Sequence, residues 1–247
     1  MTLRNALNLL VVTGLLSCTN GSKVETVTSE SDNETMYQVA TLQALLDGEY
    51  DGLITVNELR KHGDTGLGTF DKIDGEMIIV DGTVYQARYD GTVSVADDSL
   101  TVPFANITHF DSDITVPLKQ VKSMEDLTEQ ITKAITPHGL NHIYAVRIDI
   151  PQCDSVLFRS ELPQQKPYRP LAEVLQNDQR EFSCQGIGGT IVALYFPDFF
   201  DKHNSPGWHC HFISDDKSKG GHMFNIAISK EVEAHVDATP YYNLYLP

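Results

Sequence analysis

Three histidines lie close together near the C-terminus of this sequence, in a pattern that can bind a metal ion. His209 and His211 are separated by one residue, so in a β-strand both side chains would share a face while Cys210 points to the opposite face. The polar residues 214–221 end in two glycines, which is typical of a hairpin connection, and a returning strand would begin at His222. That strand would bring His222 opposite His211, so the sequence predicts three imidazoles on one patch.

Three neutral imidazoles that leave a coordination position open are the ligand set of a catalytic zinc or a similar divalent ion. A closed structural site would use four protein ligands, often cysteines. The alternative is a pair of surface histidines with an unrelated third, because His-x-His alone is a weak signal. The hairpin favours a metal site with His209, His211 and His222 as ligands.

Two further positions are candidates for charge or proton transfer. Glu76 follows the Asp74-Gly75 turn at the start of an apolar strand, where most acids are only solvated turn residues. Arg159 lies inside an apolar stretch, where an arginine either pairs with a carboxylate or holds an anion. Neither position decides a function alone, and Cys210, facing away from the histidines, is a poor candidate for a nucleophile.

The helices and strands that would position these residues are predicted to form a sheet-rich α+β fold. Residues 52–110 alternate β-prone runs with Asp-Gly turns, which predicts an antiparallel meander. Helices are predicted at residues 41–48, from Ser123 to Pro137, and after Pro170. Further strands are predicted at residues 142–150, 156–160, 186–196, 232–236 and 242–246, in addition to the histidine hairpin.

The charge of the chain limits its partners. The sequence has 18 basic and 34 acidic residues, a formal net charge of −16. This excess argues against a nucleic-acid backbone or an anionic membrane surface as a partner. A small anionic substrate would need a local positive centre, such as a metal ion or an arginine.

The N-terminus resembles a bacterial lipoprotein signal. Arg4 precedes an apolar run that is too short to span a bilayer, and the run ends in Leu15-Leu16-Ser17-Cys18. We expect Cys18 to carry lipid and to anchor the protein in the cell envelope; an ordinary secretory signal and a buried apolar segment are the alternatives. Three cysteines would then remain, and this odd number predicts no disulfide framework. The expected organisation is a signal at residues 1–18, a polar tether at 19–35 and a globular domain at 36–247.

Several short motifs follow one another in a fixed order, at residues 41–52, 66–70, 74–76, 166–170, 189–192, 207–213, 220–222 and 243–247. In their order and spacing together, they resemble the bacterial α-acetolactate decarboxylase family. The resemblance implies mixed and antiparallel β-sheets with a few peripheral helices, and a homodimer. It also implies a lyase that removes CO2 from 2-acetolactate, a 2-hydroxy-3-keto acid, and releases acetoin.

When the family's functional residues are carried over position by position, the resemblance implies a role for each candidate residue. His209, His211 and His222 would hold Zn2+, which would stabilise the enediolate left when CO2 departs. Arg159 would be the active-site arginine that neutralises the carboxylate. Glu76 would be an acid that delivers the proton to the product carbon.

One departure from the family concerns a second acid. Family members continue past the strand that ends here at Pro247 into a segment that brings another glutamate to the site. Either that acid is dispensable, Glu233 or Asp237 replaces it, or the chain is truncated and its activity impaired. The rival interpretations are a metal- or ligand-binding lipoprotein that has lost catalysis, and a cupin-type metalloenzyme. The cupin motif fits poorly, because Asp215 stands where a cupin has glutamate.

Overall fold

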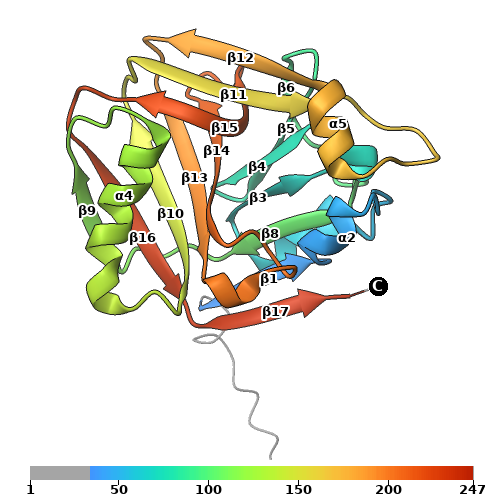
Figure 1. Cartoon of the computed structure of the whole chain (residues 1–247), viewed down its shortest axis with the longest axis horizontal. Coiled ribbons are helices and arrows are strands. Elements are labelled where there is room, and N and C mark those ends of the chain that lie inside the picture. The colour runs from blue at the N-terminus through green and yellow to red at the C-terminus, as the bar shows by residue number, and fades with distance from the viewer. Residues whose placement is uncertain (1–33, 247) are drawn as a thin grey trace, which may run out of the picture.

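Two large β-sheets packed face to face form the body of the computed structural model, which describes residues 34–246 (Figure 1). The strands of the first sheet are β1 (Thr35–Val39), β3 (Thr65–Thr69), β4 (Glu76–Val80), β5 (Thr83–Ala87), β6 (Val93–Val95), β8 (Phe104–Thr108) and β17 (Tyr241–Tyr245). Those of the second sheet are β9 (Ile114–Leu118), β10 (Ile143–Ile150), β11 (Ser155–Glu161), β12 (Gln179–Gln185), β13 (Gly189–Phe196), β14 (Gly207–Ser214), β15 (Gly220–Ala227) and β16 (Val232–Thr239). Strands β2 (Ile54–Thr55) and β7 (Thr101–Val102) pair separately.

The helices are few and lie outside the two sheets. They are α2 (Leu42–Leu46), α3 (Val56–Leu59), α4 (Met124–Ile135) and α5 (Leu171–Asn177), with single 3-10 turns at η1 (Arg60–His62), η2 (Asp71–Ile73), η3 (Thr136–His138) and η4 (Asp198–Phe200). As predicted, α4 begins after Ser123, whose side chain accepts a hydrogen bond from the backbone N–H of Asp126. Thr41 caps α2 and Pro170 precedes α5. The predicted α+β class with mixed sheets and peripheral helices is confirmed.

The strand order shows where the sequence prediction was incomplete. The first sheet runs β17-β1-β8-β3-β4-β5-β6 and the second β12-β11-β15-β14-β13-β10-β16-β9. The predicted meander holds for β3 to β6, and the turn between β4 and β5 has both Asp81 and Gly82 at positive φ, 51° and 71°. Strand β8, however, returns to pair with β3 and β1, so residues 52–110 are not one continuous meander. Strands β1, β9 and β12 were not predicted.

Alternation along the strands separates the two faces of each sheet. In β4, Ile78 and Val80 pack against the second sheet, whereas Met77 and Ile79 belong to a cluster on the far side of the first sheet. In β14, Cys210 packs in the core under α4, which confirms that it points away from the histidines. Glu76 and the histidines of β14 therefore face the space between the two sheets.

The signal at residues 1–18 and most of the tether lie outside the described residues. Among residues 34–246, Cys153, Cys184 and Cys210 are free thiols. Within the same range, no helix has the length and apolar character needed to cross a membrane.

The two carboxyl groups considered as substitutes for a second active-site acid lie elsewhere. Glu233 is exposed on β16 opposite Pro117, and Asp237 is fully buried on β16 opposite Ala145. Strands β10 and β13 separate β16 from β14, a distance of about 14 Å at ordinary strand spacing. Neither residue reaches the histidine patch, so neither is the substitute acid that the sequence left open as one of three alternatives.

We expect Asp237→Asn to stabilise the full chain at pH 8. Burial, followed by the nearby Asp111, Asp113 and Glu34, raises the pKa of Asp237 from 3.8 to about 8. The folded state therefore holds a proton that the unfolded chain has released, and stability present below about pH 4 is lost as the pH rises toward about 8. The variant lacks this penalty, so at pH 8 its free energy of unfolding should exceed that of the wild type by on the order of 2 kcal/mol.

Urea denaturation of both proteins at pH 4 and pH 8 measures the difference. Glu233→Gln, which removes an exposed carboxylate from the same strand, is the matched control and should leave stability within about 0.5 kcal/mol at both pH values. If Asp237→Asn raised the free energy of unfolding by the same amount at pH 4 and pH 8, the raised pKa of Asp237 would be contradicted.

Candidate active site

The β14–β15 hairpin brings the three histidines together. His211 and His222 are directly opposite each other in the antiparallel register, which confirms the hairpin predicted from the sequence. His209 lies two residues before His211 and on the same face of β14. Gly221 allows β11 to approach β15 closely at this point, because a Cβ there would lie 2.2 Å from the carbonyl oxygen of Arg159.

The imidazole nitrogens are spaced as ligands of one ion would be. His209 Nε2 lies 3.1 Å from His211 Nε2 and 3.1 Å from His222 Nδ1. Two zinc–nitrogen bonds of about 2.0–2.1 Å at a tetrahedral angle place their nitrogens about 3.3 Å apart. The three histidines form the one group of three or more His, Cys, Asp or Glu side chains within residues 34–246 that is compact enough to hold a metal ion.

A backbone carbonyl of the other sheet orients His211. Its Nδ1 lies 2.8 Å from the carbonyl oxygen of Met77 on β4, so Nδ1–H donates and Nε2 is left with a free lone pair. Burial lowers the pKa of His209 to about 4. Burial and the neighbouring His209 lower the pKa of His211 and of His222 well below their usual range. All three imidazoles are therefore neutral at pH 7, the form that binds metal.

The structure also brings Arg159 and Glu76 to the histidines. Arg159 on β11 is the register partner of His222 on β15, so the two side chains are neighbours on one face. Glu76 enters from β4, with Oε2 3.4 Å from His211 Nε2. Both are buried, at 9% and 6% exposure. The five residues selected from the sequence thus converge from two sheets.

Glu76 is held in a setting that favours its neutral form. Burial raises the pKa of Glu76 well above its usual range, the negative charge of Glu161 raises it further, and Arg159 opposes both effects. Burial and Glu161 thus favour the protonated form of Glu76, the form that can donate a proton.

Glu161 is an acidic residue of this site that sequence reasoning missed. It lies two residues after Arg159 on β11, is 4% exposed, and has Oε1 3.0 Å from Arg159 Nη1. Arg159 Nη1 also donates to Gln179 Oε1 of the unpredicted β12, at 3.0 Å. The alternation of a strand places residues 159 and 161 on one face, a signal that was available in the sequence.

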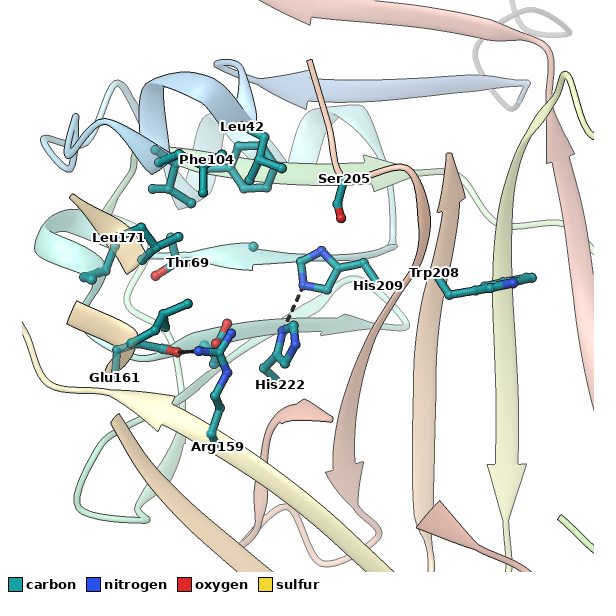
Figure 2. Close-up of a pocket in the computed structure, with 16 residues that line it drawn as sticks. Leu42, Thr69, Phe104, Arg159, Glu161, Leu171, Ser205, Trp208, His209 and His222 are labelled. Carbon is teal, nitrogen blue, oxygen red and sulfur yellow. Dashed lines mark hydrogen bonds and ion pairs between the residues drawn. The ribbon is translucent and has the colours of Figure 1, made fainter. Parts of the chain in front are cut away.

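These groups line a cavity of about 320 Å³ between the sheets. Figure 2 shows Arg159, His209 and His222 directed into a common space, whereas the indole of Trp208 points away from it. Apolar side chains of α2, α5 and β8 line the rest of the cavity: Leu42, Leu45, Leu46, Leu171, Leu175 and Phe104. The cavity therefore joins a polar end, where one arginine lies beside two carboxyl groups and neutral imidazoles, to an apolar end, as a site for a small organic ligand would.

Fold and site together define a class: a two-sheet α+β enzyme with a candidate metal centre beside a buried arginine and a buried acid. The chain belongs to the alpha-acetolactate decarboxylase family, whose model matches residues 36–247. It is thus an enzyme of the carboxy-lyase class. This assignment excludes the cupin interpretation.

Individual relatives agree with the family assignment. The chain is 36% identical to the alpha-acetolactate decarboxylase of Methanosarcina mazei over 219 residues, which cover 89% of this chain and 74% of that protein. It is 34% identical to the one from Methylococcus capsulatus over 217 residues, covering 87% and 81%. The crystal structure of the Bacillus subtilis strain 168 alpha-acetolactate decarboxylase superimposes with a TM-score of 0.81 at 35% identity, covering 86% of this chain and 89% of that one.

We expect the full chain to bind one divalent ion through the histidines. His211→Ala removes one of the three ligands and should reduce bound zinc to less than about a tenth of the wild-type content, since the remaining pair leaves an incomplete site. His142→Ala, which removes an exposed loop histidine, is the control and should retain the ion. Elemental analysis after dialysis against a zinc buffer measures the stoichiometry, and equal zinc in both variants would exclude this ligand set.

Proposed function

We propose that this protein decarboxylates 2-acetolactate to acetoin and CO2, with zinc held by His209, His211 and His222. The observation that carries the proposal is a cluster of three neutral imidazoles beside one arginine and one carboxyl group whose neutral form is favoured by burial, at one cavity lined by His209 and His222. The named function of the relatives supports the same substrate.

The reaction breaks the bond between C1 and C2 of a β-keto acid. CO2 leaves, the bonding electrons pass to the neighbouring ketone, and C2 must then receive a proton. The three imidazoles would hold a divalent ion, which would supply Lewis-acid stabilisation for the negative charge on the substrate oxygens. The ligands fit this ion because they are neutral and correctly spaced, and because Met77 fixes the ring of His211.

Arg159 and Glu76 have complementary tasks in this scheme. The Arg159 guanidinium attracts the substrate carboxylate into a protein of net charge −16. Glu76, kept neutral by burial, gives its proton to C2, and its fixed position selects the face of C2 that is protonated. The Glu76 carboxylate then regains a proton from water, so each turnover consumes one proton from the solvent.

The alternative from another class is a protein of the same fold that binds a metal and a ligand without turnover. We expect instead that the zinc-loaded full chain, mixed with racemic 2-acetolactate, releases CO2 and forms one acetoin enantiomer, as followed by gas evolution and chiral chromatography. Treatment with a chelator and the variant His209→Ala should each abolish the reaction. Bound zinc with no turnover above the His209→Ala background would favour the binding protein.

Glu76→Gln should lower kcat by about 10²–10⁴-fold, because the amide cannot supply the proton. The variant should keep its zinc, since Glu76 is not among the proposed ligands. Steady-state kinetics and metal content are the two measurements, with Glu233→Gln as the control that retains full activity. Wild-type turnover by Glu76→Gln would remove Glu76 from the role of proton donor.

A further inference from the structure

Phe224 is a large apolar side chain beside the active site to which the proposed reaction gives no task. It lies on β15 two residues after His222, is 36% exposed, and does not line the cavity. A single exposed phenylalanine is common on protein surfaces and needs no explanation by itself. The backbone setting of Phe224 and the two contacts of its ring distinguish it from such a residue.

A β-bulge on β15 directs the Phe224 side chain to the face of the histidines. Two consecutive residues of β11 pair with Met223 and with Asn225, so Phe224 is left without a partner on that strand. An uninterrupted strand would place residues 223 and 225 in the core, whereas Met223 and Ile226 are the core residues here. Bulges re-aim side chains in this way next to functional sites.

The ring of Phe224 contacts both an arginine and a candidate metal ligand of the site. The guanidinium carbon of Arg159 lies 5.2 Å from the centroid of the ring, within the range of a cation–π interaction. The imidazole of His222 meets the same ring edge-on, with the two ring centroids 5.7 Å apart at an interplanar angle of 69°. One side chain therefore packs against the charge that would attract the substrate carboxylate and against one of the three imidazoles.

The Phe224 ring restrains Arg159 without adding a competing anion. Arg159 Nη1 already donates to Gln179 Oε1 at 3.0 Å and lies 3.0 Å from Glu161 Oε1. Nη2 makes no hydrogen bond with the described residues and is not among their fully buried unpartnered atoms, so it retains accessible surface on a side chain that lines the cavity. The ring attracts the delocalised positive charge and offers no carboxylate, so a donor remains for the substrate.

We propose that Phe224 is a positioning residue for the substrate carboxylate: its ring holds the Arg159 guanidinium beside His222, where the carboxylate binds. The inference rests on the proposed decarboxylation. Phe224 does not line the cavity, so it acts through Arg159 and takes no part in bond breaking or proton transfer. Its effect is on the affinity for a ligand that carries a carboxylate.

Phe224→Leu keeps an apolar side chain and removes the aromatic ring. It should raise KM for 2-acetolactate by about 3- to 30-fold, the range expected for the loss of a partly desolvated cation–π contact. The contact with the carboxylate is already made in the bound substrate, so kcat should change by less than about threefold. Steady-state kinetics of the zinc-loaded full chain measures both constants.

Product inhibition separates an effect through Arg159 from a general disturbance of the site. Acetoin lacks the carboxylate, so its inhibition constant should be the same for the wild type and for Phe224→Leu. If Phe224 served only to support His222, KM for 2-acetolactate and the inhibition constant of acetoin would rise together. That result would overturn the inference.

Two further variants complete the comparison. Phe224→Tyr retains the aromatic ring and should restore the wild-type KM. Phe199→Leu removes another exposed phenylalanine, which is 65% exposed on η4 and outside the cavity, and should leave KM unchanged. Zinc content and the urea midpoint of Phe224→Leu should equal those of the wild type, which separates the positioning role from loss of the metal centre or of the fold.

A crystal structure of Phe224→Leu provides a test that does not depend on activity. We expect the Arg159 guanidinium to leave its wild-type position while His209 and His211 stay in place. Wild-type KM for 2-acetolactate in Phe224→Leu would overturn the inference alone. If the wild-type chain itself does not act on 2-acetolactate, the proposed function fails. An unmoved guanidinium in the variant crystal would then overturn the inference separately, and a displaced one would support the positioning of Arg159 by Phe224.

Discussion

The antiparallel register between β14 and β15 is the constraint on which the site depends. It sets His211 opposite His222, and the register of β11 on β15 adds Arg159 to the same row. A slip of one residue on either strand would turn its side chains to the opposite face, into the core beneath α4. Backbone hydrogen bonds therefore set the positions of His211, His222 and Arg159 without any contribution from an ion or a substrate.

Features encoded locally were predictable from the sequence. Two histidines and the third across one short loop depend on strand periodicity and a hairpin, so spacing alone identified the three imidazoles. The helix boundaries followed from capping residues such as Ser123, whose side chain binds the nearby backbone. Arg159 and Glu76 were found as candidates, but their roles came from the family resemblance.

Features that depend on the packing of distant segments were not predictable in the same way. The return of β8 to β3 and the approach of β4 to the histidine hairpin are long-range contacts with no local signal. Strand β12 is an edge strand with many polar, exposed residues, so it lacks the apolar alternation of a buried strand. Glu161 shares a face with Arg159 by simple alternation, but Glu76, whose pKa it raises, belongs to the other sheet. Asp237, one of the two carboxyl groups considered as a substitute acid, is buried far from the histidines, and the sequence gives no local signal that separates these cases.

The bond from His211 to the carbonyl oxygen of Met77 has a thermodynamic consequence. All three candidate ligands belong to one sheet, yet the ring that completes them is oriented by the backbone of the other sheet. The affinity for the ion and the packing of the two sheets are consequently linked. Because linkage is reciprocal, any free energy that sheet packing adds to ion binding is added by ion binding to sheet packing. A bound ion would therefore stabilise the packing of the two sheets against each other, although all of its protein ligands belong to the second sheet.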